Sequence, residues 1–142
     1  MKKGFTLVEI LIAVAVMGIL LGLSFSVYQA LSKNSDLNLA AATSVQTIRR
    51  AQLLSQAMKQ DDTWGVKLQT GEAIIFKGTS FSGRTQSYDE IYSLPGTVSI
   101  SGDTEIVFTK FTGFLPSAKS ITLTIGNKTK TININVQGKI EY

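Results

Sequence analysis

A long run of uncharged residues near the N-terminus constrains this chain more strongly than its overall composition does. The run extends from Ile10 to Leu31 and reads ILIAVAVMGILLGLSFSVYQAL. As an α-helix rising about 1.5 Å per residue it is roughly 33 Å long, enough to cross the hydrocarbon core of a bilayer. Lys2 and Lys3 precede it. Because cytoplasmic ends carry the positive charge, they predict a cytoplasmic N-terminus with the rest of the chain on the other side.

Three other interpretations of the run are open. A secretory signal peptide has an apolar region of about 7–15 residues before a small-x-small cleavage site. Ala13 and Ala15 supply such a pair, but further apolar residues follow them. A buried core helix is also apolar on all sides, but the composition is too lopsided for a chain of this size. An ordinary single-pass anchor explains the length but not Glu9, the only charged residue between Lys3 and Lys33.

Glu9 lies at the edge of the run, where an acidic side chain suggests a partner cation. A carboxylate costs on the order of 2.5–3.5 kcal/mol toward the bilayer centre and less near the interface. If a peptidase cut between Gly4 and Phe5, the new α-amino group would be charged and one helical turn from Glu9, in the same chain or a staggered neighbour. Such a pair in a low-dielectric setting resists separation, because breaking it strands a charge. Alternatively, Glu9 only interacts with the helix dipole, worth about 0.3–1 kcal/mol.

The segment KKGFTLVEILIAVAVMGILLG, from residue 2 to about residue 22, resembles the class III signal and N-terminal helix of type IV prepilins and pseudopilins. The resemblance implies that a prepilin peptidase and methylase recognises Gly4, removes residues 1–4 and methylates Phe5, which leaves the terminal charge in place. It also implies that Glu9 recruits and registers the subunit in a helical filament. The implied partners are other pilin or pseudopilin subunits, that peptidase, an inner-membrane assembly platform and the lipid bilayer.

Small residues within the run predict close packing against another helix. Gly18 and Gly22 form a G-x-x-x-G pair, with Ala13 and Ala15 nearby. Many filament pilins carry a proline shortly after the position of Gly22, where this chain has Ser-Phe-Ser at 24–26. That difference favours a pseudopilin or minor subunit.

The sequence as a whole predicts an α+β, pilin-like fold, with a long N-terminal helix packed on an antiparallel β-sheet. The expected divisions are a leader at 1–4, a transmembrane and filament-core helix at 5–31, its amphipathic half at 32–61 and a β head at 62–142. The precursor is expected in the inner (cytoplasmic) membrane as a single-pass protein with its head outside, and after assembly in a periplasmic or extracellular filament.

Periodicity defines the elements after Leu31. Apolar residues recur at steps of three and four, which predicts an amphipathic helix that ends near Gln60. Alternating residues then predict short strands in a single antiparallel sheet laid on the apolar stripe of the helix. The expected strands are at 64–68, 73–76, 98–100, 105–109, 121–125 and 132–136, with a turn at Gly126-Asn127 and a long surface loop at 78–90.

The β half is similar to the H-type minor pseudopilins of type II secretion and the related T-type minor pilins. The similarity consists mostly of hydrophobic periodicity and turn glycines. The motifs that carry it are Ala51-Gln52, Ser55-x-Ala57, Trp64-Gly65-Val66, Phe76-Lys77-Gly78, Ile106-Val107-Phe108, Gly113, Ile121-x-Leu123 and Gly138-Lys139-Ile140. It implies a minor structural subunit of a secretion or pilus-like filament.

Composition excludes many kinds of enzyme. The chain has no His and no Cys, so it offers no thiolate zinc site, no imidazole-paired nucleophile and no His base. Its carboxylates are scattered in turns, where Asp is an ordinary residue. The pairs Asp61-Asp62 and Asp89-Glu90 lack the alternating spacing of an EF-hand loop. We therefore expect no catalytic residue, no metal site and no cofactor.

Nucleic acid is the alternative partner, although the sequence favours it less than a filament. Residues 106–142 hold five lysines against Glu141, a local balance of +4. The lysines are Lys110, Lys119, Lys128, Lys130 and Lys139. Some T-type minor pilins bind DNA during uptake, so the resemblance allows a membrane-anchored DNA-binding minor pilin. Lysines on the outer face of a sheet also keep its edges soluble, and no Arg-rich or aromatic-interleaved patch accompanies these.

Overall fold

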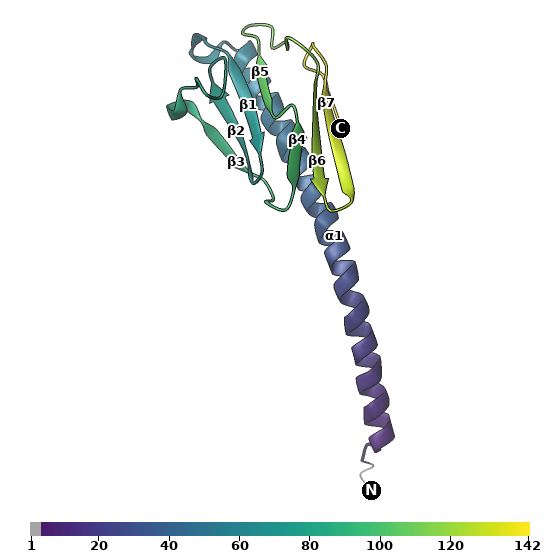
Figure 1. Cartoon of the computed structure of the whole chain (residues 1–142). Coiled ribbons are helices and arrows are strands. Elements are labelled where there is room, and N and C mark those ends of the chain that lie inside the picture. The colour runs from purple at the N-terminus through teal and green to yellow at the C-terminus, as the bar shows by residue number, and fades with distance from the viewer. Residues whose placement is uncertain (1–3) are drawn as a thin grey trace. The chain divides into compact units, whose positions relative to one another are not determined.

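The computed structural model describes residues 4–142, apart from the side chains of residues 23–27 and 30. The predicted leader residues 1–3, with Lys2 and Lys3, lie outside the described residues, whereas the backbone of the predicted span at 5–31 is described throughout. The chain divides into two compact units, one ending at Asn34 and one spanning Ser35–Tyr142. Figure 1 shows the helix and the strands of the chain, coloured from the N-terminus to the C-terminus.

One helix, α1 (Leu7–Gln56), contributes to both units. Residues 34–36 are helical, so the helix does not restart at the Asn-Ser-Asp sequence there. In the second unit one face of α1 is buried at steps of three and four, as the amphipathic pattern predicts. The buried residues of this face are Leu37, Ala40, Ala41, Ser44, Val45, Thr47, Ile48, Ala51 and Ser55.

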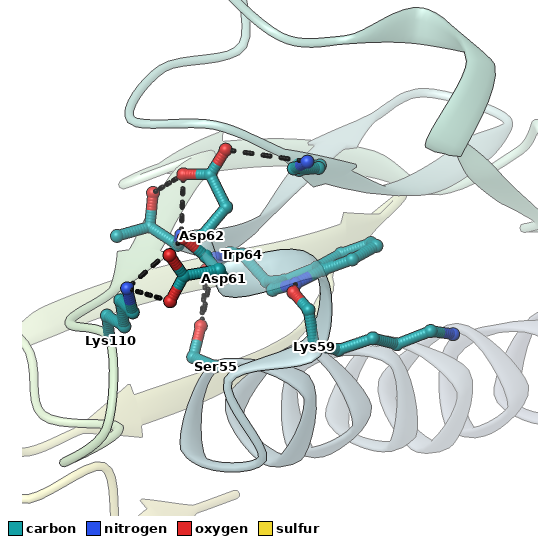
Figure 2. Close-up of polar contacts among 8 residues, drawn as sticks. Ser55, Lys59, Asp61, Asp62, Trp64 and Lys110 are labelled. Carbon is teal, nitrogen blue, oxygen red and sulfur yellow. Dashed lines mark hydrogen bonds and ion pairs between the residues drawn. The ribbon is translucent and has the colours of Figure 1, made fainter.

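The helix ends at Gln56, earlier than the predicted end near Gln60. Met58 adopts a left-handed conformation (φ 49°) and is 45% exposed, so it does not continue the apolar stripe. The buried hydroxyl of Ser55 accepts the N–H of Trp64 at 2.9 Å, and the Ser55 carbonyl accepts the N–H of Phe111 at 3.0 Å. The Ser55 carbonyl, which a further helical turn would use, thus bonds to a loop residue, and the Ser55 hydroxyl holds the start of the strand that begins at Trp64. Figure 2 shows the contact between Ser55 and Trp64.

Two antiparallel sheets replace the single sheet that the alternation predicts. The first has the order β3-β2-β1-β5 and the second β4-β6-β7-β8. The strands of the first are β1 (Trp64–Gln69), β2 (Glu72–Lys77), β3 (Glu90–Ser93) and β5 (Glu105–Phe108). Those of the second are β4 (Ser99–Gly102), β6 (Lys119–Ile125), β7 (Lys128–Ile134) and β8 (Ile140–Glu141).

The short link between β4 and β5 explains the separation into two sheets. β4 pairs with β6, whereas β5 pairs with β1, although only Asp103 and Thr104 connect them. Gly102 has φ +89°, and a Cβ there would approach the carbonyl oxygen of Ser120 to 2.4 Å. The glycine allows the chain to pass close to β6 and change sheets, and the Thr104 carbonyl accepts the N–H of Leu68 at 2.8 Å on the β1 side.

The buried core of the second unit lies between the helix face and both sheets. Its largest side chains include Trp64, Phe108 and Ile48, and both β6 and β7 contribute alternate residues to it. The α+β class of the prediction is therefore confirmed. On the β3 side, Arg50 of α1 donates to both carboxylate oxygens of Glu90, at 2.5 and 3.0 Å.

The segment predicted as a surface loop at 78–90 is exposed or partly exposed along its length, and part of it packs on a sheet. It contains a 3₁₀ turn at Gln86–Tyr88, and its last residue begins β3. Phe81 packs edge-on against Phe76, with 5.5 Å between ring centroids. A Cβ on Gly65 would lie 2.5 Å from the Phe76 ring, so the glycine makes room for this second, smaller apolar layer.

Candidate functional site

The predicted cleavage bond lies in non-helical backbone at the start of the described chain. Gly4, Phe5 and Thr6 precede α1 and belong to no helix or strand. Phe5 is 80% exposed, and no other group lies within 4 Å of a Cβ placed on Gly4. The Gly4-Phe5 bond is therefore sterically open in the described residues.

Thr6 caps the helix that follows. Its hydroxyl accepts the backbone N–H of Glu9 at 3.2 Å, and its carbonyl accepts the N–H of Ile10 at 3.3 Å. Thr6 is thus the N-cap residue and Glu9 the third residue of the helix, the spacing of a capping box. Sequence reasoning missed the role of Thr6, although the Thr-x-x-Glu spacing before an apolar run was a readable signal.

The Glu9 side chain is exposed in the first turn of α1. Within residues 4–142, no salt bridge involves its carboxylate. The N-terminal end of a helix favours a negative charge, so the position suits Glu9 even without a counter-ion. The described chain supplies the capping geometry but not the cation that the sequence predicts.

The helix surface from Leu7 to Leu21 is apolar and exposed. Each of its large apolar side chains is about half exposed or more. They are Leu7, Val8, Ile10, Leu11, Ile12, Val14, Val16, Met17, Ile19, Leu20 and Leu21. Among the residues that the structure describes, no helix reaches the length and apolar character that crossing a membrane requires.

The small residues proposed for helix packing do not all share one face. At about 100° per residue, Ala15, Gly18 and Gly22 fall within a narrow sector of α1, whereas Ala13 points to the opposite side. A Cβ at either glycine would meet nothing within 4 Å. Of the four predicted packing residues, Ala15, Gly18 and Gly22 therefore share one face of α1, and the space beside both glycines is open in the described chain.

Three of the five lysines are paired with carboxylates instead of forming a free basic patch. Lys110 pairs with Asp61, Lys119 with Asp103 at 3.2 Å, and Lys139 with Glu141 at 2.7 Å (Figure 2 shows the first pair). Asp61 and Asp103 lie outside residues 106–142 and offset two of the charges counted there. The remaining two, Lys128 and Lys130, are on β7, and the Lys130 Nζ is 6.0 Å from the centroid of the Tyr142 ring.

The pKa directions agree with this pairing. The hydrogen bond and charge of Lys110 lower the pKa of Asp61. The pKa of Asp103 is lowered first by the backbone N–H of Ser120 and then by Lys119. Glu141 raises the pKa of Lys139 through a hydrogen bond. These shifts favour the charged states of Asp61, Asp103 and Lys139.

Of the five lysines, Lys119 and Lys139 lie beside the same cleft. They line a cleft of about 480 Å³ on the second sheet, together with their partners Asp103 and Glu141. Its lining thus holds two carboxylates beside the two lysines, which does not suit a polyanion. Across the described residues, no group of three or more acidic, His or Cys side chains could hold a metal ion.

Comparison with known proteins adds one finding. Residues 1–25 match the family model of the prokaryotic N-terminal methylation motif. No solved structure matches the chain. The motif supports the predicted resemblance to type IV prepilins and pseudopilins, and it implies cleavage by prepilin peptidase, anchoring in a membrane through the N-terminal helix and assembly with other pilin subunits. The match does not extend to the H-type subfamily.

Proposed function

We propose that this type IV pilin-like protein is a minor structural subunit of a type II secretion or type IV pilus-like filament. In this proposal the precursor sits in the inner membrane with its N-terminus in the cytoplasm and the β head outside. Prepilin peptidase removes residues 1–4, Phe5 is methylated, and the subunit enters a filament through residues 5–31. The minor, H-type role rests on the similarity of the β half and on the Ser-Phe-Ser sequence at 24–26.

The observation that carries the proposal is the uncovered apolar surface of α1 within the matched prepilin-type motif. Burying one large aliphatic side chain is worth about 1.5–3 kcal/mol, and the surface from Leu7 to Leu21 holds eleven of them. A helix this apolar on all sides needs surroundings that the chain itself does not provide. Lipid before assembly, and the helices of other subunits after it, would provide them.

Glu9 has a specific role in this proposal. Cleavage after Gly4 creates an α-amino group at Phe5, close to a carboxylate for which the described residues offer no salt-bridge partner. Pairing of the amine with Glu9 of the same or a neighbouring subunit would neutralise both charges within an apolar filament core. The face formed by Ala15, Gly18 and Gly22 would let an adjacent helix approach closely.

Mass spectrometry of the mature N-terminus tests the proposal directly. The protein is purified from cells that contain prepilin peptidase and from cells that lack it. We expect a chain that begins at methylated Phe5 in the first case and the intact precursor in the second. A chain that keeps Met1 in both would contradict the proposal and favour a plain membrane anchor that displays a binding head.

A further inference from the structure

The start of α1 is fixed by one side chain close to the proposed cleavage site. Thr6 uses its hydroxyl and its carbonyl to accept the N–H groups of Glu9 and Ile10, at 3.2 and 3.3 Å. The first helical residue is consequently Leu7. The Gly4-Phe5 bond lies outside the helix by a margin of only two residues.

This margin matters for hydrolysis. A peptidase must reach the carbonyl of Gly4, and whether a backbone segment can be cut depends on its burial and hydrogen bonding. Hydrolysis adds water across the Gly4-Phe5 amide, so that Gly4 leaves as a carboxylate and Phe5 gains an amino group. In the described conformation Phe5 is exposed and the backbone at Gly4 is open.

The sequence offers a competing start for the same helix. Glycine is about as good an N-cap as threonine, and both are far better than valine or alanine. If Gly4 were the cap, Phe5 would be the first helical residue and the Gly4 carbonyl would accept the N–H of Val8. The bond to be cut would then be drawn into the first turn of the helix.

We propose that Thr6 is a positioning residue for leader cleavage: its cap holds the start of α1 at Leu7 and keeps the Gly4-Phe5 bond in open backbone. This inference rests on the proposed function, because it assigns Thr6 a part in the processing step. Thr6 acts through the helix boundary and not through contact with the reacting atoms.

The test compares cleavage rates of full-length precursors in detergent micelles with a purified prepilin peptidase. Thr6→Val keeps the size of the side chain and removes the capping oxygen, so we expect kcat/KM to fall about fivefold. Thr6→Ser and Thr6→Asn retain a capping group and should be cut at least as fast as the wild type. Thr47→Val is the matched control, since Thr47 donates its hydroxyl to the Thr43 carbonyl at 2.8 Å in the second unit; its cleavage should not change.

A second measurement separates helix position from direct recognition of the threonine. The backbone ¹³C chemical shifts of Phe5 should move toward helical values in Thr6→Val and stay at the wild-type values in Thr6→Ser. Equal cleavage of Thr6→Val and the wild type would overturn the inference. So would an equal loss in all three Thr6 variants, because the peptidase would then be reading threonine itself. A wild-type precursor that the peptidase leaves intact would instead overturn the proposed function.

Discussion

The two parts of α1 share one backbone conformation but differ in what surrounds them. From Leu7 to Leu21 the large apolar side chains are exposed, whereas between Leu37 and Ser55 one face is buried by the strands of the second unit. The second part has an apolar stripe, with polar residues on its other faces. The first part has no such stripe, because apolar residues lie on all of its faces. The apolar face of an amphipathic helix can be buried by the rest of its own chain, but a helix that is apolar on all sides depends on other molecules for burial. Mutations should therefore affect assembly in the first part and folding in the second.

Of the substitutions considered, Glu9→Gln should have the largest effect. It should reduce assembly into filaments without changing the folding of the second unit. The substitution keeps the side-chain shape but leaves the Phe5 amine of the proposed pair without its counter-charge, and losing one partner of a buried pair costs about 3–5 kcal/mol. We expect at least a tenfold loss of incorporation into filaments, measured by immunoblotting of sheared filament fractions. Thermal unfolding of the second unit should not change. Normal incorporation of Glu9→Gln would contradict the pairing mechanism.

Matched isoleucines test the same contrast through stability. Ile48 is fully buried and Ile12 is 58% exposed. Ile48→Ala should lower the free energy of unfolding of the second unit by about 2–5 kcal/mol, because it removes packed methyl groups and leaves a cavity. Ile12→Ala should change it by less than about 0.5 kcal/mol. Denaturant unfolding of both variants in detergent gives the comparison, and equal losses would show that the two parts of α1 do not differ as described.

Two buried serines sharpen the comparison within the second part of α1. The Ser55 hydroxyl accepts the Trp64 N–H at 2.9 Å, whereas the buried Ser44 hydroxyl has no hydrogen-bond partner among residues 4–142. Ser55→Ala should destabilise the second unit by about 1–3 kcal/mol, since it leaves a buried N–H unsatisfied. Ser44→Ala should be neutral or slightly stabilising. If thermal unfolding ranked the two variants in the opposite order, the helix end would not depend on the Ser55 contact.

The smallest expected effect is a pH dependence at the Arg50–Glu90 pair. The hydrogen bonds from Arg50 are the main cause that lowers the pKa of Glu90 below its ordinary value of 4.5. A lowered folded-state pKa adds stability that is complete above the unfolded value and is lost as the pH falls through the folded value. Because half of the Arg50 side chain is exposed, the contribution should be below about 1 kcal/mol.

Unfolding measured between about pH 6 and pH 3 isolates this contribution when the wild type is compared with Glu90→Gln. The difference in unfolding free energy between the two should shrink as the solution becomes more acidic. A constant difference over that range would mean that the ionised state of Glu90 does not stabilise the contact between α1 and β3.

Local patterns predicted the elements well, and they did so for a physical reason. Side-chain period follows backbone geometry, so the strands at 64–69, 72–77, 105–108 and 119–125 could be read from alternation to within about two residues at their ends. The strand at 128–134 was expected at 132–136, so its start was placed too late. β3 and the short β8 were missed: in β3 the apolar residues Ile91 and Tyr92 are neighbours and do not alternate, and Ile91 faces solvent at 63% exposure. The helix end was misplaced because Met58 continues the spacing but not the burial.

Pairing between distant segments could not be predicted in the same way. The alternation in β4 and β5 shows which face of a sheet each residue lies on, but it does not show which strand is the neighbour of β4 or of β5. The division into two sheets instead depends on a contact between distant residues, the close approach of Gly102 to Ser120. At the N-terminus the prepilin-type resemblance identified the region that the family model matches. The cap at Thr6 was missed although its spacing could have shown it, and residues 4–142 offer no salt-bridge partner for the predicted assembly residue Glu9.

The two-residue link that places β4 and β5 in different sheets also sets the order in which the two sheets can form. A chain emerging from its N-terminal end holds every strand of the first sheet once Phe108 is available, but β4 must wait for β6, which is complete only at Ile125. Until then β4 has no strand to pair with, and its pairing requires a contact with a segment that follows the completed first sheet in the sequence. Truncations before Ile125 should therefore leave the β4 edge unpaired and open to aggregation, even though half of the strands are already paired.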